Sequence, residues 1–156
     1  MNHRLTRTLW LPRPVGEVFA FFADAANLER ITPPELRFRI VTPPPIPMAA
    51  GTLIDYRLAL WGGPLGWRTP ISHWQPGEYF VDEQVEGPYR RWVHTHRFGL
   101  EAGGTRVDDT VDYQLPFAPL GDLAWPIVAV ELKRIFDYRT RAVAAILAPD
   151  QPAVAR

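Results

Sequence analysis

One stretch near the C-terminus, residues 127–148, contains neither proline nor glycine, although the whole chain has 17 prolines and 11 glycines. Its apolar and amphipathic residues recur mostly at the spacing of one α-helical face. They are Ile127, Val130, Leu132, Ile135, Phe136, Tyr138, Arg139, Val143, Ile146 and Leu147. The sequence therefore predicts one long C-terminal helix, whose apolar stripe must be covered by the rest of the chain.

Short segments of alternating apolar and polar residues make up most of the preceding chain. In residues 3–12, Leu5, Leu9 and Leu11 share one face, which is typical of a strand with one buried side. Further strands are predicted at residues 35–42, 51–61, 67–74, 78–87, 90–100 and 105–116, separated by turns rich in glycine and proline. Because Pro70 has no N–H group, we expect a bulge or a sheet edge there.

The segment after Pro14 predicts two short helices between the first two strands. Val18, Phe21 and Phe22 have helical spacing, and the pattern breaks near Asp24. The complete order fits an α+β fold, in which a curved antiparallel sheet of about seven strands grips the long C-terminal helix. We expect a single domain over residues 1–148, followed by a flexible tail at residues 149–156.

The composition argues against several classes of function. The 17 Lys and Arg residues balance 17 Asp and Glu residues, which argues against bulk electrostatic binding of nucleic acid or an anionic membrane. The absence of cysteine excludes disulfides, thiolate catalysis and cysteine-ligated zinc. No apolar run approaches the roughly 20 residues that span a bilayer, and the N-terminus lacks a signal-peptide core. We therefore expect a cytoplasmic protein with no integral membrane segment.

The order of elements and several sequence blocks resemble the START-related helix-grip superfamily, also called SRPBCC or birch-pollen-allergen-like. The blocks are residues 11–36, 51–58, 66–72, 80–98 ("FVDEQVEGPYRRWVHTHRF"), 103–121 and 135–139. They look most like its bacterial stand-alone branch, described as ligand-binding or cyclase/dehydrase-like, and the resemblance covers about residues 3–148. It implies an internal, mostly apolar cavity between sheet and C-terminal helix, and no particular reaction.

The last two predicted strands can be aligned from their apolar faces. Val107, Val111, Tyr113 and Leu115 share the apolar face of the second strand. Matching that face places Trp92, His94, His96, Phe98 and Leu100 inward, since a slip of one residue would bury arginines instead.

Asp109 falls on this apolar face, where an isolated carboxylate is costly. With a turn at residues 101–104, Asp109 lies directly opposite His96. We expect the two to form a buried or cavity-lining pair that raises the pKa of His96 and fixes its tautomer.

The strand predicted at residues 78–87 has two possible inward faces. Periodicity alone favours the face that contains Tyr79 and Val81, whereas the superfamily pattern favours Phe80, Asp82 and Gln84, which we adopt. The adjoining strands would place Tyr56, Trp67, Thr69 and Ile71 at the cavity, and Phe136, Tyr138 and Arg139 would close it from the helix.

An aromatic-rich hollow with a few convergent polar groups is the usual composition of a small-molecule site. The predicted function is binding of a small hydrophobic ligand, which would be lipid-like, polyketide-like or aromatic. The predicted binding residues are Tyr56, Trp67, Ile71, Gln84, Trp92, His94, His96, Phe98, Asp109, Val111, Tyr113 and Phe136.

Three other interpretations of the histidines stay open. They could form a purely structural polar cluster. They could serve a polyketide cyclase or dehydratase, with His96 as the catalytic base and Asp109 orienting it. They could bind a metal through His94, His96 and Asp109, although His96 would then have to turn from Asp109 or lose it as a ligand. We expect no metal and no cofactor.

Two proline-rich segments, residues 41–48 and 115–126, are candidates for rigid corners or for a lid over the cavity. Met48, Leu120 and Trp125 would then be exposed apolar rim residues, or contacts of a homodimer.

Overall fold

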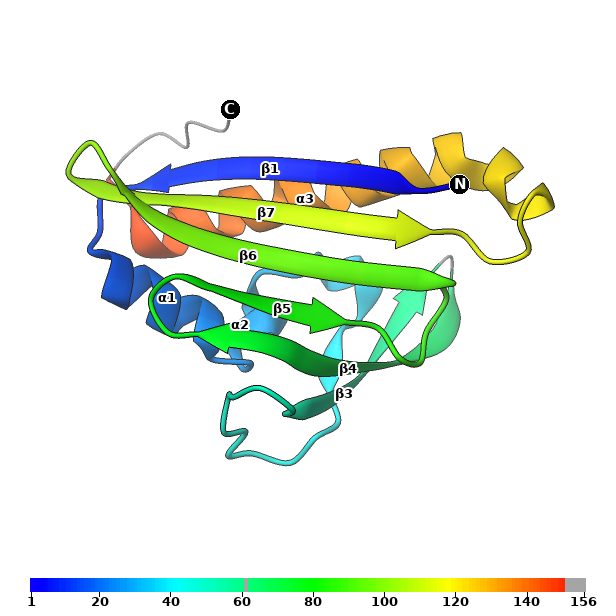
Figure 1. Cartoon of the computed structure of the whole chain (residues 1–156), viewed down its shortest axis with the longest axis horizontal. Helices are drawn as coiled ribbons and strands as arrows, with labels where there is room; N and C mark the ends of the chain where they lie inside the picture. The colour runs from blue at the N-terminus through cyan, green and yellow to red at the C-terminus, as the bar shows by residue number, and fades with distance from the viewer. Residues whose placement is uncertain (61, 151–156) are drawn as a thin grey trace.

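One antiparallel sheet forms the frame of the molecule (Figure 1). Within residues 1–60 and 62–150, the part of the chain that this computed structural model describes, the sheet has seven strands in the order β1-β7-β6-β5-β4-β3-β2. The strands are β1 (His3–Leu11), β2 (Arg39–Ile40), β3 (Leu53–Leu60), β4 (Gly63–Gln75), β5 (Tyr79–Glu83), β6 (Arg91–Glu101) and β7 (Gly104–Gln114). The predicted sheet is confirmed. Trp61, the predicted end of one strand, and residues 151–156 of the predicted tail lie outside the described residues.

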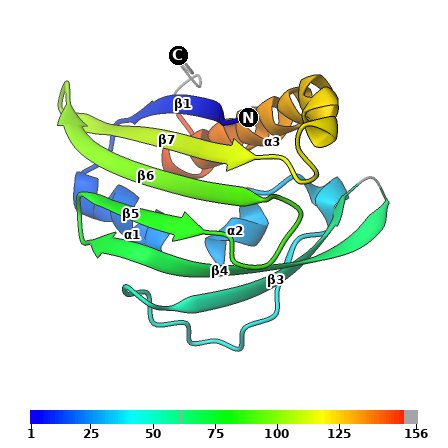
Figure 2. The same cartoon turned by 45° about the vertical axis from the view of Figure 1, so that its right-hand side comes forward.

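The helices lie on one face of the sheet, which curves around them (Figure 2). They are α1 (Val15–Ala23), α2 (Asn27–Arg30) and α3 (Trp125–Leu147), with 3-10 turns η1 (Pro34–Leu36) and η2 (Leu120–Ala124). In Figure 1, α3 runs behind β1 and β7, whereas α1 and α2 lie behind β4 and β5. The predicted pair of short helices and the long helix are confirmed. Helix α3 begins before Pro126 because the first helical turn tolerates the missing N–H of proline.

The inward stripe of α3 differs from the predicted one at its start. Its buried residues are Val128, Leu132, Phe136, Thr140, Val143, Ala144 and Leu147. Ile127 and Val130 were predicted to face inward and are exposed instead. Val128 takes the inward position of the first turn, so the 3.6-residue period runs continuously only from that residue.

The hairpin of β6 and β7 has the predicted register. His96 lies opposite Asp109, His94 opposite Val111 and Trp92 opposite Tyr113. The prediction that Leu100 faces the interior is wrong, because this side chain is 81% exposed. The tip of the hairpin projects beyond the helices in Figure 1, so none of the described helices covers its last inward-facing position.

Prolines shape the strands that flank the cavity. The sheet register shifts between Ile71 and His73, directly after Pro70, which agrees with the expected bulge. The strand predicted at residues 35–42 shrinks to Arg39–Ile40. Its first residues instead complete the 3-10 turn that begins at Pro34, after which Arg37 adopts a left-handed backbone conformation.

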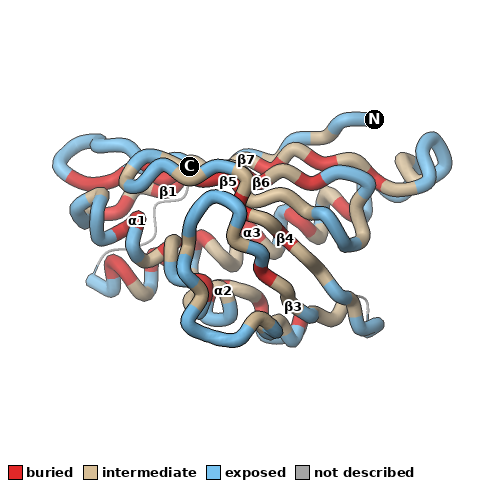
Figure 3. Tube along the Cα trace, turned by 60° about the horizontal axis from the view of Figure 1, so that its bottom comes forward, coloured by how far each residue is buried: buried red, intermediate tan, exposed pale blue. Residues whose placement is uncertain are grey.

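The core contains three apolar clusters, and polar side chains lie between the two larger ones. Buried residues alternate with more exposed ones along the central strands (Figure 3). One cluster packs Phe19, Phe22 and Phe98 with the C-terminal half of α3, and a second packs Trp92 with its N-terminal half. The third and smallest cluster contains Ala25, Ile54 and Ile71. On β6 the buried histidines His94 and His96 lie between Trp92 and Phe98, and so interrupt the apolar face at its centre.

Among the described residues, no helix combines the length and the apolar character needed to cross a membrane.

Candidate functional site

A cavity of about 180 Å³ lies between the helices and the β3–β6 part of the sheet. Its walls are mostly aliphatic and aromatic. The helices and the segments that connect them contribute Phe22, Ala25, Leu28, Ile31, Thr32, Leu36, Phe38, Met48, Leu132, Ile135, Phe136 and Arg139. The sheet and the β5–β6 loop contribute Ile54, Tyr56, Leu58, Leu60, Trp67, Thr69, Ile71, Phe80, Asp82, Tyr89, Trp92, His94 and His96.

Seven of the predicted binding residues lie on the cavity wall, namely Tyr56, Trp67, Ile71, Trp92, His94, His96 and Phe136. Thr69, Phe80 and Asp82 also face it, as the sequence pattern indicated. Trp67 is fixed by a hydrogen bond of 3.0 Å from its indole nitrogen to the hydroxyl of Thr69. The alternation of side chains along the strands therefore predicted most of the cavity-lining residues that the sheet contributes.

Phe98, Val111, Tyr113 and Asp109 point to the helical side of the sheet, but they do not line the cavity. Phe98 packs in the cluster under α1, and Val111 and Tyr113 pack under the N-terminal half of α3. The hydroxyl of Tyr113 accepts a hydrogen bond of 3.2 Å from Trp125. The prediction of these residues as direct cavity residues is wrong because the helices cover this part of the sheet.

Gln84 does not face the cavity either. Its side chain donates to the carbonyl of Tyr89 at 2.6 Å and accepts from the N–H of Tyr89 at 3.2 Å. Strand β5 ends at Glu83, so alternation no longer determines the direction of the next side chain. Gln84 thus holds the loop that brings Tyr89 to the cavity wall.

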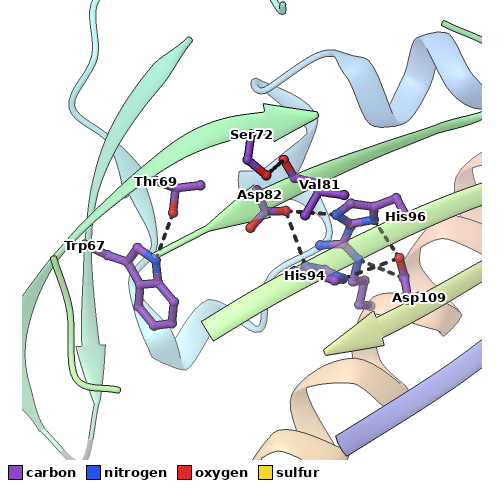
Figure 4. Close-up of polar contacts among 9 residues, drawn as sticks. Trp67, Thr69, Ser72, Val81, Asp82, His94, His96 and Asp109 are labelled. Carbon is purple, nitrogen blue, oxygen red and sulfur yellow. Dashed lines mark hydrogen bonds and ion pairs between the residues drawn. The ribbon is translucent and has the colours of Figure 1, made fainter. Parts of the chain in front are cut away.

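The polar end of the cavity is a cluster of histidines and carboxylates from three neighbouring strands (Figure 4). His96 Nδ1 lies 2.6 Å from Asp109 Oδ1, and His96 Nε2 lies 3.0 Å from Asp82 Oδ2. Each carboxylate oxygen accepts, so an imidazolium at His96 can donate to both. The predicted His96–Asp109 pair is present, with Asp82 as a second partner.

His94 lies beside His96 in the same cluster, with ring centroids 3.8 Å apart. Its Nδ1 is 3.5 Å from Asp82 Oδ2, and its Nε2 is 3.4 Å from Asp109 Oδ1. Within the described residues, neither ring nitrogen of His94 meets the geometry of a hydrogen bond. A buried polar side chain is thus left with two near partners and no hydrogen bond.

Burial and charge together separate the two histidines. Burial lowers the pKa of His94, and the neighbouring His96 lowers it further, so His94 is held neutral. Burial also disfavours charge on His96, but the charge of Asp109 and the hydrogen bonds to both carboxylates raise the pKa of this residue. The interior would raise the pKa of Asp109, yet the charges of His96 and Arg139 hold it well below its usual value.

Arg139 completes the cluster from the helix. Its Nε lies 3.6 Å from Asp109 Oδ2, and its guanidinium carbon lies 5.5 Å from the ring centre of Phe22. Within the part of the chain that is described, the guanidinium forms no hydrogen bond although it lines the cavity. Arg139 therefore places a cationic side chain, paired with Asp109, at the polar end of the cavity.

Sequence reasoning missed most of the helical wall. Phe22, Leu28 and Ile31 reach the cavity from the short helices, and Phe38 and Met48 reach it from the connections around β2. The helical spacing of Phe22 was a usable signal. The irregular connections gave none, since no period fixes where their side chains point.

A family model described as polyketide cyclase / dehydrase and lipid transport matches residues 11–137. No curated protein matches the chain.

Several solved structures are similar to this one. The Zhui aromatase/cyclase from Streptomyces sp. R1128 has 17% identity and a TM-score of 0.74, with 97% of this chain and 100% of that chain covered. A protein from Thermus thermophilus has 21% identity and a TM-score of 0.70, with 97% and 100% covered. The ginseng major latex-like protein 151 from Panax ginseng has 13% identity and a TM-score of 0.66, with 95% and 99% covered. At such identities the likeness establishes the fold, and the predicted helix-grip architecture is confirmed.

Proposed function

Since the chain belongs to the polyketide cyclase / dehydrase and lipid transport family, we propose that it binds a small hydrophobic molecule in the cavity between its sheet and helix α3. The observation that carries this proposal is the division of one cavity into a long apolar wall and a single polar end. The polar groups gather at Asp82, His94, His96 and Arg139, while aromatic and aliphatic side chains dominate elsewhere. This is the usual construction of a small-molecule site.

The volume of the cavity limits the size of the ligand. Apolar cavities of roughly 150 Å³ accept a molecule such as benzene. With about 180 Å³ available, a body of one or two fused rings, or a short branched chain, fits without rearrangement. Trp67 and Trp92 meet edge to face at 5.2 Å in the wall and offer flat surfaces for such a body.

The polar end favours a ligand that carries an oxygen. Arg139 lines the cavity there, and a guanidinium pairs well with a carboxylate or another oxygen anion. Asp82 and Asp109 are both committed to His96, so they do not need a donor from the ligand. The proposed ligand is therefore a compact apolar molecule with one carboxylate, phenolate or carbonyl oxygen directed at Arg139.

Filling the cavity tests this proposal. Ile71 is buried in the wall, and Ile71→Phe should weaken binding of naphthalene-2-carboxylate by more than about tenfold, because the added ring occupies ligand space. Val93 points to the opposite face of β6, so Val93→Phe is the matched control and should bind as the parent does. Isothermal titration calorimetry gives both affinities, and thermal melts verify folding. Equal binding by the parent and a folded Ile71→Phe variant would contradict the proposal.

A second candidate is an enzyme of the cyclase or dehydratase type. The observation in its favour is the buried His–Asp cluster at the cavity wall, because such groups can move protons. The specific role suggested for His96 needs revision, since both of its nitrogens already contact carboxylates. His94 is the better general base, because burial keeps it neutral and its Nδ1 lies 3.5 Å from its nearest carboxylate oxygen, on Asp82.

In such a reaction His94 would take a proton from a carbon next to a ligand carbonyl, and Arg139 would stabilise the resulting enolate oxygen. Turnover of a poly-β-ketone surrogate, followed by mass spectrometry, tests this candidate. A loss of turnover in His94→Gln that exceeds the loss in His73→Gln, an exposed histidine, would support it. Equal turnover in the two variants would contradict it.

A further inference from the structure

His94 is the unexplained residue of the site. Its side chain is only 6% exposed, and its Nε2 atom is fully buried without a hydrogen-bond partner among the described residues. Buried polar groups almost always find a partner. If Nε2–H turns to Asp109 Oδ1, which is 3.4 Å away, the lone pair of His94 Nδ1 is left facing the Asp82 side, where a bound cation would satisfy it.

The two imidazoles lie between two carboxylate oxygens (Figure 4). On one side, Asp82 Oδ2 is 3.0 Å from His96 Nε2 and 3.5 Å from His94 Nδ1. On the other side, Asp109 Oδ1 is 2.6 Å from His96 Nδ1 and 3.4 Å from His94 Nε2. Each histidine thus directs one nitrogen to Asp82 and the other to Asp109.

This arrangement distinguishes the imidazole nitrogens that could bind a cation from the carboxylate that orients the two rings. If Asp109 accepts the N–H of both rings, the lone pairs of His96 Nε2 and His94 Nδ1 both point to the Asp82 side. Metal-ligating histidines normally donate their second N–H to a carboxylate or carbonyl, which fixes the tautomer and the ring orientation. Asp109 occupies that supporting position for two imidazoles at once.

We propose that Asp82, His94 and His96 bind a divalent transition-metal ion at the polar end of the cavity, with Asp109 orienting both imidazoles. One ligand atom from each of the three residues lies within 4.8 Å of the others. Atoms bound at about 2.1 Å to one ion lie no more than about 4.2 Å apart, so small side-chain rotations close the triangle. The sequence pointed to Asp109 as the third ligand, whereas the structure assigns that position to Asp82.

The donor set indicates the class of metal. Two imidazoles and one carboxylate suit Zn²⁺, Fe²⁺, Co²⁺ or Ni²⁺ better than Mg²⁺ or Ca²⁺, which prefer oxygen ligands. Three protein ligands leave at least one coordination position open. All three residues line the cavity, so the open position faces the space proposed for the ligand.

Cobalt titration of the tag-free full chain, stripped with a chelator, tests the site. We expect one equivalent of Co²⁺ to bind and to give visible ligand-field absorption. His94→Gln and Asp82→Asn should each weaken Co²⁺ binding more than about 100-fold, and Asp109→Asn about 10- to 100-fold. His73→Gln removes an exposed histidine and should leave the affinity unchanged. Absence of stoichiometric binding, or retention of binding in a folded His94→Gln variant, would overturn the proposal.

NMR spectroscopy of the parent chain with Co²⁺ tests the site even if a variant does not fold. Bound Co²⁺ shifts the NMR signals of the imidazoles that coordinate it. Shifted signals from His94 and His96 would support the site, and shifted signals confined to His3 or His73 would overturn it. Binding of naphthalene-2-carboxylate to the metal-free chain is measured separately, so failure of the metal site and failure of the ligand cavity are distinguishable.

Discussion

His96 and Asp109 are joined across neighbouring strands by a hydrogen bond of 2.6 Å in the centre of the core. The pair connects the sheet to the cavity, because Asp109 lies behind the cavity wall while His96 forms part of it. Its environment also includes His94 on β6, Asp82 on β5 and Arg139 on α3. In this small region the carboxylates and the cationic side chains offset each other's charge at short distances. Replacing one of these residues should therefore change the stability of the fold or the properties of the site strongly.

Removing the charge of Asp109 should destabilise the fold strongly. Asp109→Asn leaves the imidazolium of His96 without its main counter-charge, and breaking a buried pair costs about 3 to 5 kcal/mol of unfolding free energy. Asp108→Asn on the outer face is the matched control and should cost about 1 kcal/mol or less. Urea unfolding measures both. Similar losses for the two variants would show that Asp109 is not part of a buried charge network.

The stability of the metal-free protein should depend on pH through His96. Its folded-state pKa is above the usual value of about 6.5, so the proton on His96 stabilises the folded chain below that pH. The stabilisation is lost as the pH rises through the folded-state pKa. In urea unfolding, the stability advantage of the parent over His96→Gln should therefore narrow as the pH rises over the range above about 6.5. An advantage that stays constant over this range would contradict the assignment.

At low pH, the folded chain should lose stability through protonation of the carboxylates in the same cluster. The pKa values of Asp82 and Asp109 are lowered in the folded chain, so their stabilisation is present above about pH 3.9 and is lost as the pH falls below it. Fluorescence-monitored acid unfolding should therefore begin at a higher pH in Asp109→Asn than in Asp108→Asn. Coincident acid transitions of the two variants would argue against this role.

Two residues on the same face of β6 should respond very differently to truncation. Phe98 is buried among Phe19, Phe22 and Phe80, so Phe98→Ala should cost about 3 to 5 kcal/mol. Leu100 is exposed at the hairpin tip, and Leu100→Ala should change stability by less than about 0.5 kcal/mol. Chemical denaturation measures the unfolding free energy of both variants. The difference between them shows where along β6 the helices stop covering the strand. A large loss for Leu100→Ala would mean that another surface covers the tip.

Gln84 should matter for the β5–β6 loop and not for direct ligand contact. Gln84→Ala removes two hydrogen bonds to the backbone of Tyr89, at an expected cost of about 1 to 3 kcal/mol. Naphthalene-2-carboxylate should bind this variant within about threefold of the parent affinity, since the side chain does not line the cavity. A tenfold loss of affinity with little loss of stability would reverse this interpretation.

The fold and the pairing of the central hairpin were predictable because simple periodicities control them. Alternation fixed the inner face of β6 and β7, and a lone carboxylate on that face identified His96 as the partner of Asp109. The same reasoning failed where regular structure ends. Gln84 follows the last residue of β5, and Leu100 lies where no helix covers the strand.

Periodicity could not predict which residues from separate strands and helices contact one another. Asp82 was expected to face inward, but its contact with both histidines depends on how β5 pairs with β6. Arg139 was expected only to close the cavity, whereas its position beside Asp109 depends on how α3 packs across the sheet. The volume of the cavity likewise depends on connections such as the one that brings Met48 to its wall.

The most direct test of the central claim is an NMR titration of the indole N–H signals with naphthalene-2-carboxylate. The chain has 6 tryptophans, of which Trp67 and Trp92 line the cavity and Trp125 lies outside it. Binding in the cavity predicts saturable shifts of the Trp67 and Trp92 signals, with the Trp125 signal nearly unchanged. Shifts confined to Trp125, or no shifts at millimolar ligand, would contradict the claim that this cavity is a binding site for a small apolar molecule with a polar oxygen.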